Sequence, residues 1–192
     1  MKTAKALLSR GVDHLVFNTD DKAATIEFYC EVLGMRLVHA ARTPRIADQF
    51  GAGEPPVPYL RHYFFDMGND STIAFFEYPK GTAKGDRDTL GTMQHCALHV
   101  SRSDFDAAMQ RLKMHGIPYV GPVDRGIRHS IYFYDNNGVR LEFTTCPTGE
   151  DFPTVASLAQ ERTYDISGSR VQELERRLDR RLDRFHLALM SQ

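Results

Sequence analysis

The sequence contains little cysteine, no tryptophan and no long hydrophobic run. Its three cysteines are scattered and odd in number, without a CxxC pair: Cys30, Cys96 and Cys146. This pattern excludes a disulfide framework and is typical of a reducing compartment. No run approaches the roughly 18 apolar residues of a membrane span, and the start of the chain lacks the apolar stretch of a signal peptide. We therefore expect a cytoplasmic protein that does not enter a membrane.

An excess of charge of either sign is also missing. The chain has 24 Lys and Arg against 25 Asp and Glu, which gives a formal net charge of -1. Such a balance provides no overall field to attract nucleic acid or an anionic membrane. A content of 42% hydrophobic and 26% charged residues is that of a soluble globular domain. A length of 192 residues suits one domain with an appendage.

The first half of the chain predicts a strand, a helix and three further strands. Residues 12–18 and 35–40 are β-rich, and residues 20–34 place apolar side chains at three- and four-residue spacings. This helix is expected to stop at Gly34, because glycine adopts the left-handed conformation at little cost. Residues 42–60 contain four prolines and predict a loop or lid. Residues 61–67 and 71–78 predict two strands joined by a turn.

The same order of elements recurs in the second half. Residues 94–100 match the first strand, residues 101–116 match the helix, and 117–123, 128–135 and 139–145 supply three more strands. His14 to Gly34 spans 20 residues, and His95 to Gly116 spans 21. Two copies of a βαβββ unit, at about 11–80 and 92–147, predict one α+β module over residues 11–147, preceded by a tail at 1–10.

Residues 148–192 are expected to be a linker and a C-terminal amphipathic helix. In residues 168–190, leucine and other apolar side chains recur at intervals of three and four and form a narrow stripe. Such a stripe can dock on the module or pair with a second subunit, and it favours a homodimer. Arginines alternate with acidic residues along the same helix, which indicates a solvated, internally paired face.

The repeat places two histidines at equivalent positions. His14 and His95 each lie in the first strand of a copy. If a pseudo-twofold axis relates the copies, the two imidazoles come together near that axis. The last strands of the copies carry Glu77 and Glu142. Two histidines with one or two carboxylates form a mixed nitrogen and oxygen site that suits Fe(II), Mn(II), Zn(II) or Ni(II).

The two glutamates are not equivalent in the pattern. Glu142 lies in an apolar-rich strand, where an unpaired carboxylate would be costly to bury, so a metal partner is expected for it. Aligning the two strands by their following prolines puts Ala74, not Glu77, opposite Glu142. A bulge or a shifted register would be needed to make Glu77 a fourth ligand. His99 lies four residues after His95 on the same strand face, and His62 and His129 begin strands near the expected opening.

At this point the sequence resembles the vicinal oxygen chelate superfamily, which includes glyoxalase I, extradiol ring-cleaving dioxygenases, and bleomycin and fosfomycin resistance proteins. The resemblance is carried by VDHLVFNTDD, FYCEVLGMRLV, MQHCALHV and YFYDNNGVRLEF, between Gly11 and Pro147. It implies two βαβββ units forming one U-shaped mixed sheet around a divalent metal ion. The implied ligands are His14, His95 and Glu142, with Glu77 as the candidate for a fourth. The implied substrate is a small molecule with two neighbouring oxygen atoms that chelate the metal.

The stretch from Ile131 to Glu142 further resembles the extradiol dioxygenase signature. Two departures stand out: Asn136 replaces the usual proline, and His129 lies closer to Tyr132 than the histidine of the signature does. On this resemblance, the leading prediction is an extradiol-type dioxygenase for a catechol-like aromatic, with Fe(II) or Mn(II). His129 would handle protons and Tyr132 or Tyr134 would orient the substrate, in a pocket that includes the side chains of His62, His99 and Phe75.

Two alternatives stay open. A glyoxalase-like lyase or isomerase would use Zn(II) or Ni(II), with Glu77 as fourth ligand or base. A non-catalytic protein that sequesters a small molecule, as drug-resistance proteins do, would need no metal ligands. The pair of equivalent histidines argues against this second alternative.

Overall fold

The computed structural model describes residues 9–44, 59–126 and 128–148. In the first repeat these form β1 (His14–Thr19), α1 (Lys22–Glu27), a π-helical turn η1 (Phe28–Val32), β2 (Leu37–Pro44), β3 (Tyr59–Gly68) and β4 (Ser71–Glu77). In the second repeat they form β5 (Cys96–His99), α2 (Arg102–Met114), β6 (Tyr119–Asp124), β7 (His129–Tyr134) and β8 (Arg140–Thr145). The tail at 1–8, most of the 42–60 loop and the expected C-terminal helix lie outside the described residues.

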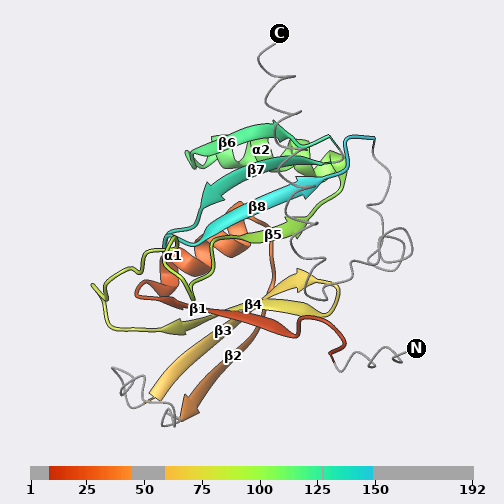
Figure 1. Ribbon diagram of the computed structural model, residues 1–192. Coiled ribbons are helices and arrows are strands. Elements are labelled where there is room, and N and C mark those ends of the chain that lie inside the picture. Colours follow the sequence, from red (N-terminus) through yellow and green to blue (C-terminus); the bar gives the residue numbers. More distant parts are fainter. Residues whose placement is uncertain (1–8, 45–58, 127, 149–192) are drawn as a thin grey trace, which may run out of the picture. The chain divides into compact units, whose positions relative to one another are not determined.

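The α+β class and the repeated βαβββ unit are confirmed (Figure 1). The eight strands divide between two four-stranded mixed sheets, with the orders β1-β4-β3-β2 and β5-β8-β7-β6. In each sheet the first strand pairs in parallel with the last strand of its repeat, and the remaining pairs are antiparallel. Among the described strands, β1 and β5 are therefore edge strands, and they are not hydrogen-bonded to each other.

One hydrophobic core joins the two repeats. Alternation along each strand sends every second side chain to one face of its sheet. In β1 these are Leu15 and Phe17, and the same core receives Phe75 of β4, Phe133 of β7 and Leu141 of β8. The face of each sheet that is turned away from this core is called its outer face below. His14 and Val16 lie on the outer face of the first sheet and are exposed.

The first helical segment contributes to the core on both sides. It starts at Asp21, whose carboxylate accepts the amide hydrogen of Ala24 (3.1 Å). The fully buried ring of Tyr29 lies 5.2 Å from Phe65 and 5.0 Å from Phe75, between ring centroids, in the first sheet. Its hydroxyl donates a hydrogen bond to Asp135, in the turn that follows β7 of the second sheet (3.1 Å). The segment thus links the inner faces of both sheets.

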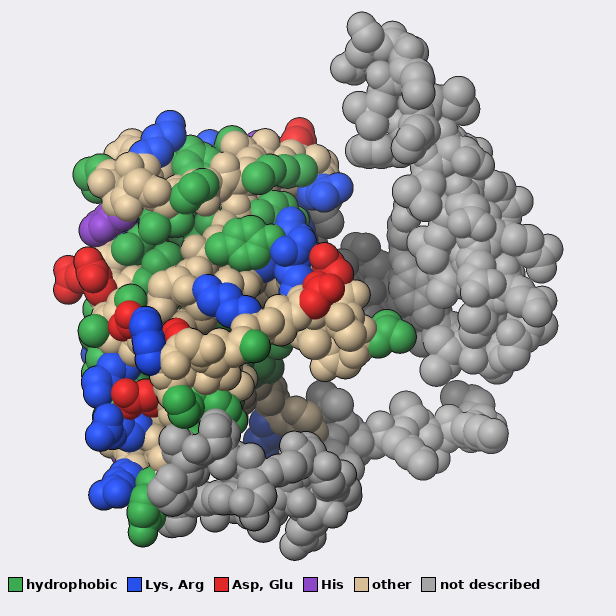
Figure 2. Space-filling view, turned by 90° about the vertical axis from the view of Figure 1, so that its left-hand side faces the viewer, with side chains coloured by type: hydrophobic (Ala, Val, Ile, Leu, Met, Phe, Trp, Pro, Cys, Tyr) green, Lys and Arg blue, Asp and Glu red, His purple; other side chains and the backbone are tan. Residues whose placement is uncertain are grey.

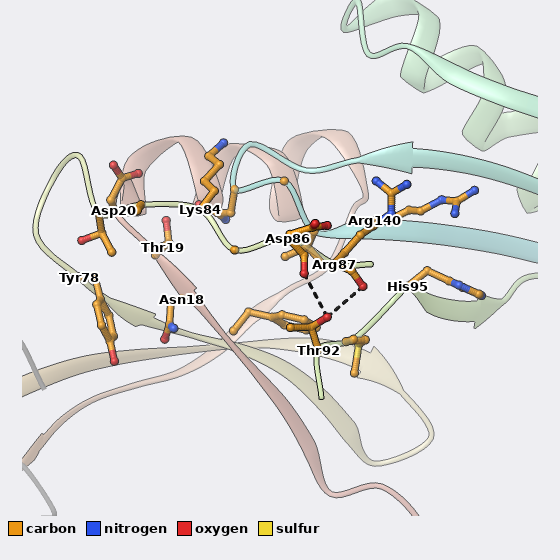
Figure 3. A pocket seen from close by; sticks show the side chains of 18 residues that line it. Asn18, Thr19, Asp20, Tyr78, Lys84, Asp86, Arg87, Thr92, His95 and Arg140 are labelled. Atoms are coloured by element: carbon orange, nitrogen blue, oxygen red, sulfur yellow. Dashed lines mark hydrogen bonds between the residues drawn. The ribbon is translucent and has the colours of Figure 1, made fainter. Parts of the chain in front are cut away.

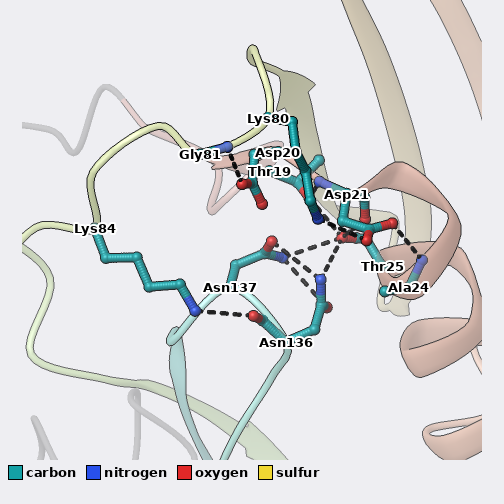
Figure 4. A network of polar contacts seen from close by, with 10 residues as sticks. All are labelled: Thr19, Asp20, Asp21, Ala24, Thr25, Lys80, Gly81, Lys84, Asn136 and Asn137. Carbon is teal, nitrogen blue, oxygen red and sulfur yellow. Dashed lines mark hydrogen bonds and ion pairs between the residues drawn. The ribbon is translucent and has the colours of Figure 1, made fainter.

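The turn after β7 is fixed by a dense set of polar contacts. The carboxylate of Asp135 accepts hydrogens from the backbone amides of Asn137 (2.8 Å) and Val139 (2.7 Å) as well as from Tyr29. Burial raises the pKa of Asp135, and these hydrogen bonds oppose the rise. Asn136, which departs from the extradiol signature, donates through its side-chain amide to Thr25 of α1 (3.0 Å; Figure 4). An asparagine here therefore makes a contact between repeats that a proline could not make.

The surface shows no segregation of charge on the face drawn in Figure 2. Lysine and arginine side chains alternate with aspartate and glutamate there, with hydrophobic side chains between them. Within the described ranges, no helix is both long and apolar enough to span a membrane.

Replacing Tyr29 with phenylalanine tests the contact between the repeats. The Tyr29→Phe variant keeps the ring but removes one of the donors to the buried Asp135 carboxylate. We expect the free energy of unfolding to fall by about 1–3 kcal/mol, the usual cost of leaving a buried acceptor with one partner fewer. Urea denaturation followed by circular dichroism measures this change. The matched Tyr134→Phe variant, which alters a partly exposed hydroxyl, should change stability by less than about 0.5 kcal/mol. Equal effects of the two variants would contradict the proposed importance of the contact.

Candidate functional site

His95 and Glu142 form a close pair on the outer face of the second sheet. Ala97 of β5 lies opposite Glu142 of β8, and His95 lies two residues before Ala97, so that its side chain shares the face of Glu142. The Nε2 atom of His95 lies 2.9 Å from Oε2 of Glu142. The side chain of His95 is 35% exposed and that of Glu142 is 11% exposed. A histidine and a carboxylate are therefore already together at a position that solvent and solutes can reach.

Tyr132 adjoins this pair. It lies directly opposite Glu142 in the antiparallel pairing of β7 with β8. Its ring stands edge-on to the imidazole of His95, with 5.9 Å between centroids. The guanidinium of Arg140 lies over the ring of Tyr132, 4.6 Å from the ring centroid. The predicted neighbourhood of Tyr132 and the two ligand candidates is thus assembled in one place.

His14 lies on the outer face of the other sheet. Its side chain is 40% exposed, its Nδ1 atom contacts the carboxylate of Asp13, and its ring centroid is 6.3 Å from that of His62. His62 is 7% exposed and stands between the rings of Phe64 (4.0 Å) and Phe76 (4.1 Å). Among the described residues, its Nε2 atom has no hydrogen-bond partner. Burial lowers the pKa of His62, and the nearby His14 and His39 lower it further.

The two histidines of the repeat do not meet within one chain. No group of three His, Cys, Asp or Glu side chains that could hold a metal ion occurs in the described ranges, so His14 does not join His95 and Glu142. The shared core explains this separation. It buries the inner faces of both sheets, and the ligand candidates lie on the outer faces.

Glu77 lies at the end of β4 that is far from His14. In the parallel pairing of β1 with β4, Glu77 is opposite Thr19, whereas His14 is opposite Thr72. Its carboxylate accepts hydrogen bonds from three side chains: Lys22 (3.2 Å), Arg61 (3.1 Å) and Tyr63 (3.0 Å). Burial alone would raise the pKa of Glu77, but these hydrogen bonds lower it below its usual value.

The strand registers identify the true counterpart of Glu142. Val16 pairs with Ala74 in the first sheet, as Ala97 pairs with Glu142 in the second. Because Val16 and Ala97 each lie two residues after the repeat histidine, Ala74 occupies the place of Glu142. Aligning the two strands by their following prolines predicts the same position. The first repeat therefore offers a methyl group where a fourth ligand would stand.

His129 and Phe75 lie elsewhere than their expected roles require. His129 is three residues from Tyr132, so strand alternation turns it to the face that carries α2, where Nδ1 lies 3.2 Å from Nη1 of Arg102. This corrects the placement of His129 beside the ligands. Phe75 is fully buried in the core and is not among the residues that line the cavity next to His95. His99 is exposed and lies on the same face as His95, two residues beyond Ala97. Tyr134, at the end of β7, accepts a hydrogen bond from Arg87.

A cavity of about 320 Å³ lies next to His95. Its walls come from the end of β1, the segment between the repeats, and the start of β8 (Figure 3). The polar residues that line it were not predicted from the sequence, and they include Asn18, Lys84, Arg87 and Arg140. Most of them lie in loops or at strand ends without a recognisable motif. The only available signal was a cationic side chain two residues before Glu142.

Comparisons with known proteins agree with this architecture. The family described as "Glyoxalase/Bleomycin resistance protein/Dioxygenase superfamily" matches residues 11–143. Similar solved structures include a glyoxalase family protein from Enterococcus faecalis, with a TM-score of 0.55 and 19% identity over 72% of this chain and 99% of that one. A protein of Bacillus subtilis, provisionally named a dioxygenase, gives a TM-score of 0.55 and 23% identity over 70% of this chain and 40% of that one.

A third similar structure is the fosfomycin resistance protein FosX from Listeria monocytogenes. One form of it gives a TM-score of 0.53 and 18% identity over 78% of this chain and 98% of that one. A variant solved with Mn(II) and 1S,2S-dihydroxypropylphosphonic acid gives 0.50 and 20% identity, over 71% of this chain and 92% of that one. At these identities the likeness is one of fold.

The contacts of Glu77 predict a structural effect on mutation. In Glu77→Gln, Lys22 and Arg61 lose an anionic partner, and we expect stability at pH 7 to fall by about 0.5–1 kcal/mol, because all three groups are partly exposed. The folded-state pKa of Glu77 is lowered, so its contribution is present above the ordinary glutamate pKa and is lost as the pH falls through the folded value. Urea unfolding at several pH values measures the difference. Loss of bound metal from this variant without a change in stability would instead identify Glu77 as a ligand.

Proposed function

Because the chain belongs to the glyoxalase/bleomycin resistance protein/dioxygenase superfamily, we propose that it is a metal-dependent enzyme of the extradiol dioxygenase type. Its substrate would be a catechol-like aromatic that presents two neighbouring oxygen atoms. The observation that carries this proposal is the pair formed by His95 and Glu142, 2.9 Å apart on an accessible outer face. Tyr132 stands beside the pair, where a substrate oxygen would be bound.

The proposed metal ligands are His95, Glu142 and the His14 side chain of a second copy of the chain. Among the described residues β1 and β5 are edge strands; His14 begins β1, and His95 lies directly before β5 and contacts Glu142 of β8. In a twofold dimer, β1 of one copy can lie beside β5 of the other, which brings His14 to the His95 and Glu142 pair twice by symmetry. The proposed site would therefore require a homodimer, since the His95 and Glu142 pair of each copy lacks the third ligand that the His14 of the other copy would supply.

The donor set fits a divalent transition metal. Two imidazoles and one carboxylate are the ligands of non-heme Fe(II) oxygenases, and they leave positions open for a substrate. Ala74 stands at the counterpart of Glu142, so the set stays at three protein donors. Fe(II) or Mn(II) is favoured, and the FosX relative solved with Mn(II) has a similar fold. When bound, the metal ion would supply Lewis-acid coordination of the two neighbouring substrate oxygens.

Side chains near the proposed ligands would orient the substrate and handle its protons. The ring of Tyr132 adjoins His95, and its hydroxyl would donate a hydrogen bond to a substrate oxygen there. We assign the proton-handling role to His62 instead of His129. The side chain of His62 lies on the same sheet face as His14, and its buried Nε2 atom has no hydrogen-bond partner among the described residues. It can accept the hydrogen of a substrate hydroxyl. The rings of Phe64 and Phe76 pack against His62.

The two alternatives make different demands. A four-ligand glyoxalase-like site would need Glu77, whose carboxylate is engaged by Lys22, Arg61 and Tyr63. A sequestering protein would bind its ligand equally well without metal.

Metal analysis of the ligand variants tests the proposed site. The protein purified anaerobically and loaded with Fe(II) or Mn(II) should hold about one metal ion per chain, as one ligand set predicts. His95→Ala and Glu142→Gln should each weaken metal binding by at least about a hundredfold, because loss of a direct ligand exceeds the usual cost of losing a supporting residue. The matched control His115→Ala alters an exposed histidine at the end of α2 and should bind metal normally. Normal metal binding by both ligand variants would contradict the proposed site.

Mixing two inactive variants tests whether two copies share the site. A heterodimer of His14→Ala and Glu142→Gln subunits contains one intact ligand set, because His14 comes from one subunit and the His95 and Glu142 pair from the other. After co-refolding in equal amounts, we expect about a quarter of all sites to regain metal and catechol cleavage, from random pairing of subunits in a twofold dimer. If the ligands come from one chain, the mixture stays as inactive as its components.

A further inference from the structure

The cavity beside His95 is lined by both polar and apolar side chains. Its apolar lining includes the side chains of Phe17, Tyr78, Met93 and Val139. In Figure 3, Tyr78 and Asp20 lie toward one end, whereas Arg87, Arg140 and His95 lie toward the other. A volume of about 320 Å³ is within the range of sites for small organic molecules. The cavity can therefore hold a small organic molecule with one polar group directed to the arginine end.

The two arginines at that end retain unused hydrogen-bonding capacity. Arg140 makes no ion pair with any described residue, and its guanidinium lies over the ring of Tyr132. Arg87 binds Tyr134 and Asp88 through its terminal nitrogens, while its buried Nε atom has no hydrogen-bond partner in the described part of the chain. A buried donor without a partner is costly, and a ligand oxygen would satisfy it.

The charge of the cavity also favours an anion. Three cationic side chains line it, Lys84, Arg87 and Arg140, against the two carboxylates of Asp20 and Asp86. Each carboxylate already accepts one backbone amide hydrogen: Asp20 from Gly81 (2.7 Å) and Asp86 from Asp88 (2.9 Å). The lining therefore has one cation in excess, and guanidinium groups match the planar geometry of an oxyanion.

We propose that this cavity binds an oxyanion, a carboxylate or a phosphonate, carried on a small flat molecule, with Arg140 and the Nε of Arg87 as its donors. His95 lines the same cavity, so the rest of the molecule reaches the His95 and Glu142 pair. As a statement about the substrate, this inference rests on the proposed function and narrows it to an aromatic acid. As a binding site, it requires no metal ion.

Titration of the metal-free full-length chain tests the site directly. Nuclear magnetic resonance shifts would be followed during addition of benzoate, phenylphosphonate and benzamide, the last being the neutral analogue of benzoate. At least one of the two anions should bind roughly tenfold more tightly than benzamide, because hydrogen bonds to charged groups are the stronger ones. The shifts should be centred on residues that line the cavity. Equal binding of all three compounds would overturn the proposal.

Variants separate this inference from the proposed function. Arg140→Gln and Arg87→Gln should each weaken anion binding roughly tenfold, whereas Arg61→Gln, which alters an arginine paired with Glu77 outside the cavity, should not. Unchanged binding in both cavity variants overturns the inference. His14→Ala should bind the anion as the unmodified chain does. Anion binding in a chain that takes up no metal would contradict the proposed function alone, and metal uptake without anion binding would contradict this inference alone.

Discussion

The arrangement of the molecule depends on the burial of one helical segment between two sheets. Tyr29 contacts Phe65 and Phe75 of the first sheet and donates its hydroxyl hydrogen to Asp135 of the second. The phenol and the carboxylate are both buried, and burial raises the pKa of each. Such groups are tolerated in a core only when they are hydrogen-bonded, so their contact fixes how the two repeats meet.

This choice of buried face has a direct consequence for function. A strand presents alternate residues to its two faces, so burying Leu15 and Phe17 leaves His14 on the outer face. The same alternation in the second sheet buries Leu141 and Phe143 and leaves Glu142 outside the shared core, beside His95. The repeat histidines consequently belong to separate sheets, and in the proposed dimer a second copy would supply the third ligand. Dimerisation and metal binding would then depend on each other.

The segment between the repeats also contributes to the chemistry of the surface. Arg87 comes from this segment and Arg140 from the start of β8, and both line the cavity next to His95. Asn136 fixes the adjoining turn by its hydrogen bond to Thr25 of α1 (3.0 Å). The turn beside the inferred oxyanion site is therefore held by a contact between repeats, next to the Tyr29 and Asp135 contact of the core. The oxyanion and the proposed metal would bind neighbouring parts of one substrate.

The sequence by itself determined the βαβββ repeat, the equivalent positions of His14 and His95 in it, and the need of the Glu142 carboxylate for a partner. These features follow from local periodicity, from glycine at the helix ends and from the cost of burying a carboxylate, all of which can be read along the chain. The placement of Glu77 could not be read in this way, because it depends on which strands pair and in which register. Nor could the orientation of His129, which a shift of one residue along a strand reverses. Only the tertiary structure decided that the inner faces share one core, which separates His14 from His95 and gathers Arg87 and Arg140 beside the site. Packing between repeats brings together residues distant in sequence, and no local pattern encodes it.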